Sequence, residues 1–155
     1  SFCMPKRELE RPEQIIEWLQ DWGGKLESPA EMILIGSGGL LWHAFQKGVE
    51  LPLPEKSMDV DPVTFDDAVA ELAYDSIIGS EFELANGWHV NLMPDMVLRE
   101  LPEGWRDRIS GVDYGNLHVI IPSPRDLIFP KLKRNEPRDR AHADWAKEVG
   151  LIEEL

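Results

Sequence analysis

Apolar residues along the chain recur at two spacings, one typical of helices and one typical of strands. Residues 12–22 place apolar side chains three or four positions apart, which predicts a helix beginning at Pro12 and ending before Gly23. The same spacing predicts helices over 38–47 and after a cap at Asp66. Ser123-Pro124 and Pro137 mark the starts of two helices in the C-terminal segment 123–149. Short apolar or alternating runs predict strands at 32–36, 57–61 and 117–121.

Residues 81–93 carry the clearest local signal, because two alternating runs flank Asn86-Gly87. An Asn-Gly pair between such runs favours a two-residue type I′ hairpin. Pro62 has no N–H to donate to a neighbouring strand, so the strand at 57–61 is expected to end there or to lie at a sheet edge. Segment 95–110 is expected to hold a short helix and a loop.

The order of these elements indicates an α+β fold: a mixed β-sheet flanked by helices, with a C-terminal helix pair. We expect a single domain over residues 1–155, with an N-terminal helix (12–22), a core (30–121) and the final helices (123–149).

Charge and composition narrow the choice of partners. The net charge is −13, from 29 acidic and 16 basic residues, and such a chain repels long nucleic acids. Basic residues gather in 124–140, so a nucleotide, a protein partner or a short RNA end fits this charge distribution. The single cysteine, Cys3, excludes an intramolecular disulfide and indicates a reducing compartment. Apolar runs stay far below the ~20 residues of a membrane span, so we expect no membrane partner and a cytoplasmic protein.

The stretch "ILIGSGGLLWHAF" (33–45) passes from a strand into a helix through a turn of small residues. Backbone N–H groups of Gly36–Gly39 and the hydroxyl of Ser37 are suited to binding a phosphate at the helix start. The dinucleotide-binding fingerprint fails, since Leu41 stands where a glycine is needed, and no Gly-Lys pair of a Walker loop is present. The alternative is an ordinary tight corner.

About twenty residues later, "SMDVD" (57–61) carries two alternating acids. A strand places Asp59 and Asp61 on one face, roughly 6–7 Å apart. Two such carboxylates repel each other unless a cation lies between them, and hard oxygen ligands suit Mg²⁺ bound together with substrate phosphates. The alternative is a solvated edge strand with two surface acids.

Together, "ILIGSGG…SMDVD" resembles the signature of the nucleotidyltransferase superfamily (DNA polymerase β-like), in which a Gly-Ser turn precedes a metal-binding Asp-x-Asp. The sequence is most similar to small bacterial members allied to the AbiEii toxins and the minimal nucleotidyltransferases. Their later helix-pair pattern corresponds to "PSPRDLIFPKLKRNEPRDRAHAD" (122–144), so the resemblance spans roughly residues 30 to 145.

The resemblance implies transfer of a nucleoside monophosphate from an NTP such as ATP to a hydroxyl group. Mg²⁺, with Mn²⁺ as an alternative, would serve as the cofactor. The acceptor would be a tRNA end or a partner protein, in a toxin–antitoxin or phage-defence setting. By the same resemblance Asp59 and Asp61 bind the metal. Residues implied to bind the nucleotide are Gly36, Ser37, Ser57 and Lys131, the last with Arg134 or Arg138 nearby; the alternative for Lys131 is a solvated helix face.

One departure bears on catalysis. Members with full activity use a third carboxylate on a later strand, and the matching position here is Asn91, whose amide cannot accept a proton as a general base. His89 shares the Asn91 face and could replace that function, whereas Glu83 is expected on the opposite face of the hairpin. The rival interpretation is an inactive binding module or antitoxin-like partner. A third is an α/β domain whose turn and acids are unrelated in space.

Three further residues receive no functional role from the sequence. Asp139 is expected to pair with a nearby arginine at the helix surface. His43 has no assignable partner, and His142 lies among charged residues on a predicted helix.

Overall fold

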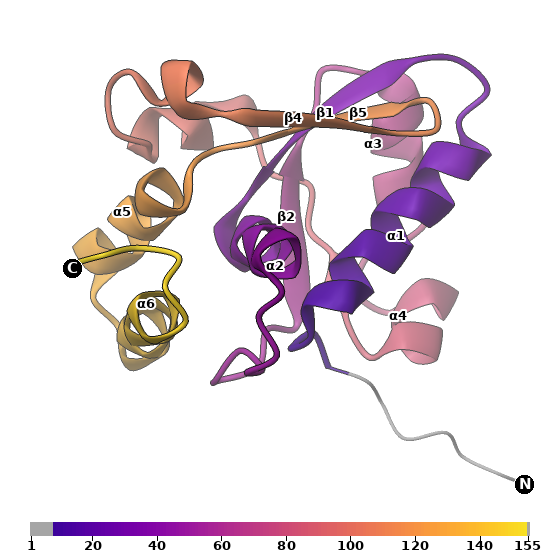
Figure 1. The fold of residues 1–155 in the computed structure, drawn as a ribbon. Helices are drawn as coiled ribbons and strands as arrows, with labels where there is room; N and C mark the ends of the chain where they lie inside the picture. The colour runs from indigo at the N-terminus through magenta and orange to yellow at the C-terminus, as the bar shows by residue number, and fades with distance from the viewer. Residues whose placement is uncertain (1–7, 155) are drawn as a thin grey trace, which may run out of the picture.

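The computed structural model describes residues 8–154 and arranges them as a five-stranded sheet with helices packed against it (Figure 1). Cys3 lies outside the described residues. The elements, in chain order, are α1 (Pro12–Lys25), β1 (Ala30–Ile35), α2 (Gly36–Lys47), β2 (Asp59–Val63), α3 (Asp67–Tyr74), α4 (Glu81–Asn86), β3 (His89–Val90), the 3₁₀ helices η1 (Asp95–Glu100) and η2 (Trp105–Arg108), β4 (Ser110–Tyr114), β5 (Leu117–Ile121), α5 (Pro124–Arg134) and α6 (Pro137–Glu148).

The sheet is mixed, with the strand order β3-β2-β1-β5-β4. Strand β1 runs parallel to β5 and antiparallel to β2, while β3 is parallel to β2 and β4 is antiparallel to β5. The predicted class, an α+β fold with a mixed sheet, flanking helices and a C-terminal helix pair, is confirmed.

Alternation along β1 divides the interior into two hydrophobic clusters. Met32 and Leu34 point to the face covered by α1 and α2, which lie side by side against the sheet (Figure 1). Ile33 points to the other face, where η1 and η2 provide the cover. This second cluster is small and holds the buried residues Ile33, Val63, Leu98, Leu101 and Trp105.

The predicted hairpin at 81–93 is wrong. Residues 81–86 form α4, because Ser80 caps the helix by accepting a hydrogen bond from the Glu83 amide. Gly87 adopts the left-handed conformation (φ 81°) and ends α4. An Asn-Gly pair suits a helix end as well as a hairpin turn, since both need a residue with positive φ. The chain then forms the two-residue strand β3, parallel to β2.

The prediction that the 57–61 strand stops before Pro62 or lies at an edge is also wrong. Strand β2 includes Pro62 and lies between β1 and β3. The Pro62 carbonyl accepts a hydrogen bond from the Met93 amide, so the side of Pro62 that lacks an N–H faces the β3 segment. The missing donor therefore costs no hydrogen bond between β1 and β2. It costs none to β3 either, because β3 ends at Val90 and does not reach Pro62.

Both final helices begin where their prolines predict. Ser123 caps α5 by accepting from the Asp126 amide, and Pro124 and Pro137 occupy first-turn positions. Strand β4, absent from the sequence prediction, pairs with β5 at the far edge of the sheet. Across residues 8–154, every helix is too short or too polar to cross a bilayer.

Candidate functional site

A cleft of about 300 Å³ opens where the end of β1 and the start of α2 meet β2, η1, α5 and α6. All seven residues that the sequence singled out for metal, nucleotide or catalysis line it: Gly36, Ser37, Ser57, Asp59, Asp61, Asn91 and Lys131. Their roles in chemistry remain predictions, but the structure places these residues around one cavity.

The Gly-Ser turn is itself the first turn of α2, which begins at Gly36 rather than at residue 38. Ile35 stands at the N-cap and offers no side-chain acceptor, so the first amides of α2 are not capped by a side chain. Gly36 adopts φ 68°, and a Cβ built there would lie 3.0 Å from Oδ2 of Asp61. A side chain would therefore be strained and would crowd the carboxylate.

Asp61 lies directly across from Ile35 in the β1–β2 register, which brings its carboxylate to the start of α2. The interpretation in which the turn and the acids are unrelated in space is therefore wrong. Burial and the adjacent charge of Asp59 raise the pKa of Asp61 to about 6. Asn91 donates from Nδ2 to Oδ1 of Asp61 over 3.3 Å, so the amide lies beside the acidic pair.

The acidic pair supplies hard oxygen ligands but not a complete coordination shell. Among residues 8–154, no group of three or more His, Cys, Asp and Glu side chains is arranged to hold an ion by itself. Mg²⁺ commonly binds one or two protein carboxylates and takes its remaining ligands from water and substrate phosphates. Asp59 and Asp61 fit such a site, in which the protein supplies only two of the ligands.

Residues beside Asp59 support it from two directions. Ser57 is buried and donates a hydrogen bond to the Asp59 carbonyl over 2.9 Å. His89 Nε2 lies 3.9 Å from Asp59 Oδ2, and His89 Nδ1 lies 2.7 Å from Glu83 Oε2. The expectation that Glu83 faces away on a hairpin strand is wrong, because α4 carries it to His89.

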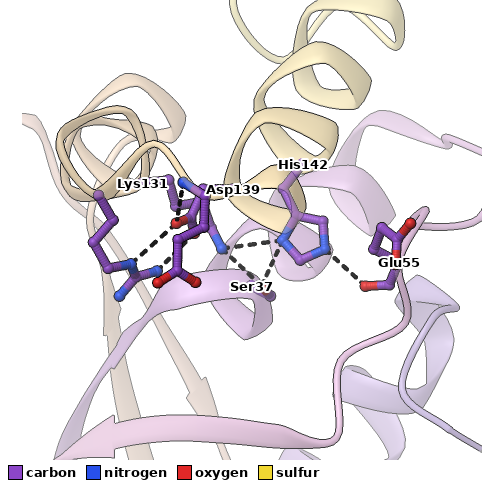
Figure 2. Close-up of polar contacts among 7 residues, drawn as sticks. Ser37, Glu55, Lys131, Asp139 and His142 are labelled. Carbon is purple, nitrogen blue, oxygen red and sulfur yellow. Dashed lines mark hydrogen bonds and ion pairs between the residues drawn. The ribbon is translucent and has the colours of Figure 1, made fainter.

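Lys131 is buried, with 5% of its surface exposed, so the alternative of a solvated helix face is wrong. Its Nζ donates to Ser37 Oγ over 3.1 Å and lies 3.1 Å from His142 Nδ1 (Figure 2). Burial lowers the pKa of Lys131 to about 8, against the attraction of Asp139 and Asp61. The ammonium thus joins α5 to the first turn of α2 at the base of the cleft.

Arg134 and Asp139 also line the cleft, from α5 and α6. Arg134 donates from Nε and Nη2 to the two Asp139 carboxylate oxygens, at 3.2 and 2.8 Å. Asp139 pairs with an arginine as expected, but it is buried rather than at the surface. Burial acts to raise its pKa, and the hydrogen bonds from Arg134 outweigh this and lower it. Arg138 also lines the cleft, so three basic side chains share it with the acidic pair.

His142 belongs to this cluster, although no functional role could be assigned to it from the sequence alone. It is fully buried, and burial and the positive charge of Lys131 lower its pKa to about 4. The helical period offered a signal, because Asp139, His142, Ala143 and Ala146 fall on one face of α6 and are all buried. What no pattern showed is that this face meets Lys131 and Ser37.

A family model described as "Nucleotidyltransferase of unknown function (DUF6036)" matches residues 13–155, nearly the whole chain. Neither the curated proteins nor the solved structures contain a significant match.

Proposed function

Because the chain belongs to this family of nucleotidyltransferases, we propose that the cleft binds a nucleoside triphosphate with Mg²⁺ and transfers its nucleoside monophosphate to a hydroxyl group. The observation that carries the proposal is that the uncapped start of α2 lies beside the Asp61 carboxylate, so close that a Cβ at Gly36 would be 3.0 Å from its Oδ2. A phosphate held at the α2 amides would lie next to oxygen ligands for its own metal ion.

Each part of the cleft has a distinct task in this proposal. Asp59 and Asp61 hold the metal, which neutralises charge on the phosphate oxygens when bound. The α2 amides, the Ser37 hydroxyl and the Lys131 ammonium hold the triphosphate tail. Arg134 and Arg138 lie on the side of α5 and α6, where they can meet phosphate or the acceptor.

The reaction breaks a phosphoanhydride bond and forms a phosphoester bond. The acceptor oxygen bonds to the α-phosphorus, the bond from that phosphorus to the β-phosphate oxygen breaks, and pyrophosphate leaves. The acceptor's hydroxyl proton passes to water. Since Asn91 cannot take this proton, the cleft contributes mainly alignment and charge stabilisation.

The acceptor is proposed to be a hydroxyl of a partner protein or of a tRNA end. The net charge of −13 favours a protein acceptor, because it disfavours a long polyanion. A toxin–antitoxin or phage-defence setting and an intracellular location belong to the same proposal.

The test is incubation of the purified chain with each of the four α-³²P-labelled NTPs, Mg²⁺ and a cell extract separated into protein and RNA. Label is expected in one fraction with wild type and with Asp144→Asn, an exposed acid on α6. Label is expected to disappear with Asp59→Asn and with EDTA. Equal labelling by wild type and Asp59→Asn would refute the proposal.

The second candidate is a nucleotide-binding module without transferase activity, favoured by the amide at position 91 beside Asp61. It predicts that calorimetry finds NTP binding independent of Mg²⁺, or none, and that no label is transferred. Recovery of transfer in Asn91→Asp would identify the amide as the cause.

A further inference from the structure

Three polar atoms meet below the cleft: Nζ of Lys131, Oγ of Ser37 and Nδ1 of His142, all within 3.3 Å of one another (Figure 2). They come from α5, α2 and α6, so the contact joins three helices. Lys131 and His142 are both at least nine-tenths buried. A hydrogen-bond donor or acceptor left unpaired at this depth is costly, so the position of each hydrogen affects the stability of the cluster.

The opposite side of the imidazole fixes its tautomer. His142 Nε2 lies 2.9 Å from the Glu55 carbonyl oxygen, which can only accept, so Nε2 must carry the hydrogen. Nδ1 is then an acceptor with one lone pair. Glu55 holds φ 47°, an uncommon conformation for a residue with a side chain, and this loop geometry presents the carbonyl to His142.

Lys131 and Ser37 both reach the single lone pair on Nδ1. The ammonium is the stronger donor because its hydrogen bond is charge-assisted. With Lys131 donating to His142 and to Ser37 Oγ, two of its three N–H groups are used. Once Lys131 occupies Nδ1, one N–H of Lys131 and the hydroxyl hydrogen of Ser37 have no further hydrogen-bond acceptor among residues 8–154, and both residues line the cleft.

We propose that His142 is a positioning residue: its neutral imidazole anchors the Lys131 ammonium beside Ser37 and leaves both side chains one hydrogen to donate to a phosphate oxygen. The inference rests on the proposed function, because it names how the same cleft holds its polyphosphate. His142 itself touches neither the reacting atoms nor the phosphate. Burial keeps the imidazole neutral, as the fixed tautomer requires.

Two substitutions separate the two sides of the ring. His142→Asn places an amide oxygen near the position of Nδ1 and so keeps an acceptor for Lys131. His142→Gln places an amide N–H near the position of Nε2, so it keeps the bond to Glu55 but leaves no acceptor at the position of Nδ1, where Lys131 donates. The probe is inorganic pyrophosphate at constant Mg²⁺, measured by calorimetry. The dissociation constant is expected to rise at least about tenfold in His142→Gln and to stay within about threefold in His142→Asn, since a hydrogen bond to a charged group is lost only in the former.

Equal affinities in wild type and both variants, equal losses in both, or no pyrophosphate binding by wild type would each overturn the proposal. A measurement on wild type covers the case in which a variant does not fold. Nitrogen-15 NMR of the imidazole at pH 7 is expected to show His142 as the Nε2–H tautomer, and an Nδ1–H tautomer or an imidazolium would overturn it. Failure of the proposed function is seen separately, as the absence of NTP label transfer.

Discussion

The ionised carboxylate of Asp61 lowers the free energy of unfolding, and a single substitution can measure by how much. Its pKa rises from 3.8 to about 6 because it is buried and lies beside Asp59. At about 1.4 kcal/mol per pKa unit, the ionised carboxylate destabilises the folded protein by about 3 kcal/mol at pH 7. Asp61→Asn keeps the shape and an acceptor for Asn91 while it removes the charge. We therefore expect it to raise the free energy of unfolding by about 3 kcal/mol, or the melting temperature by roughly 6–12 °C.

The pH dependence provides the sharper test. Between pH 3.8 and about 6 the folded state binds more protons at Asp61 than the unfolded state, so wild-type stability falls as pH rises through this window. Asp61→Asn lacks this loss. The gap between variant and wild type is expected to be near zero around pH 4, to grow up to about pH 6 and to stay level above it.

Urea denaturation followed by tryptophan fluorescence, repeated from pH 4.5 to 7.5, measures this gap. Asp144→Asn removes an exposed acid and serves as the control, with an expected change within about 0.5 kcal/mol at every pH. Mg²⁺ with a non-hydrolysable NTP analogue should stabilise wild type by about 2.7 kcal/mol at a hundredfold excess over Kd and leave Asp61→Asn unchanged. The reasoning fails if Asp61→Asn is less stable than wild type at pH 7, or if the gap is the same at pH 4.5 and 7.5.

Three further predictions concern the same cleft. Gly36→Ala should lower stability by about 1–3 kcal/mol in thermal melts and weaken NTP binding, because φ is 68° and the new Cβ would crowd Asp61. Gly24→Ala is the control and should be close to neutral, because open space surrounds Gly24. Similar melting temperatures for the two variants would contradict this prediction. Asn91→Asp should tighten Mn²⁺ binding in calorimetry and lower the stability of the metal-free protein at pH 7, since a third carboxylate would lie beside Asp61. An unchanged Mn²⁺ affinity would show that the side chain at position 91 does not contribute to metal binding. Asp139→Asn should cost about 1–3 kcal/mol in urea denaturation, because the buried Asp139 carboxylate would no longer accept both hydrogen bonds from Arg134 as an ion. A change below about 0.5 kcal/mol would contradict that role.

Local sequence chemistry predicted the elements that carry their own start signals. Pro12, Ser123-Pro124 and Pro137 each mark a helix start that the structure confirms, because a proline in the first turn loses no hydrogen bond. Asn86-Gly87 misled for a physical reason, since helix ends and tight hairpins share a left-handed residue. Strand β4 escaped notice because its alternate positions are exposed and its apolar side is only half-buried.

The cleft could be predicted in part. The proximity of the Gly-Ser turn to the acidic pair was expected only through the family resemblance, because spacing along the chain does not fix distance in space. The helical period offered a signal for the burial of Lys131, because it shares one face of α5 with the buried Leu127 and Ile128, but nothing local indicated its polar partners. Its environment depends on α6 and on the loop at Glu55, and such tertiary contacts leave no local pattern.

The two sides of the cleft differ in how firmly they are packed, because one side is formed by η1 and the small hydrophobic cluster on the second face of the sheet. Val97 and Leu101 line the cleft from η1 and its end, and they belong to the small cluster held by two 3₁₀ helices. The other side is formed by α2, α5 and α6, which are joined by the buried contacts among Ser37, Lys131 and His142. We expect η1 to exchange its amide hydrogens well before α2, because its few contacts open at a low free energy. In the proposed function, an acceptor would therefore reach the cleft on the η1 side, while the triphosphate would bind on the side formed by α2, α5 and α6.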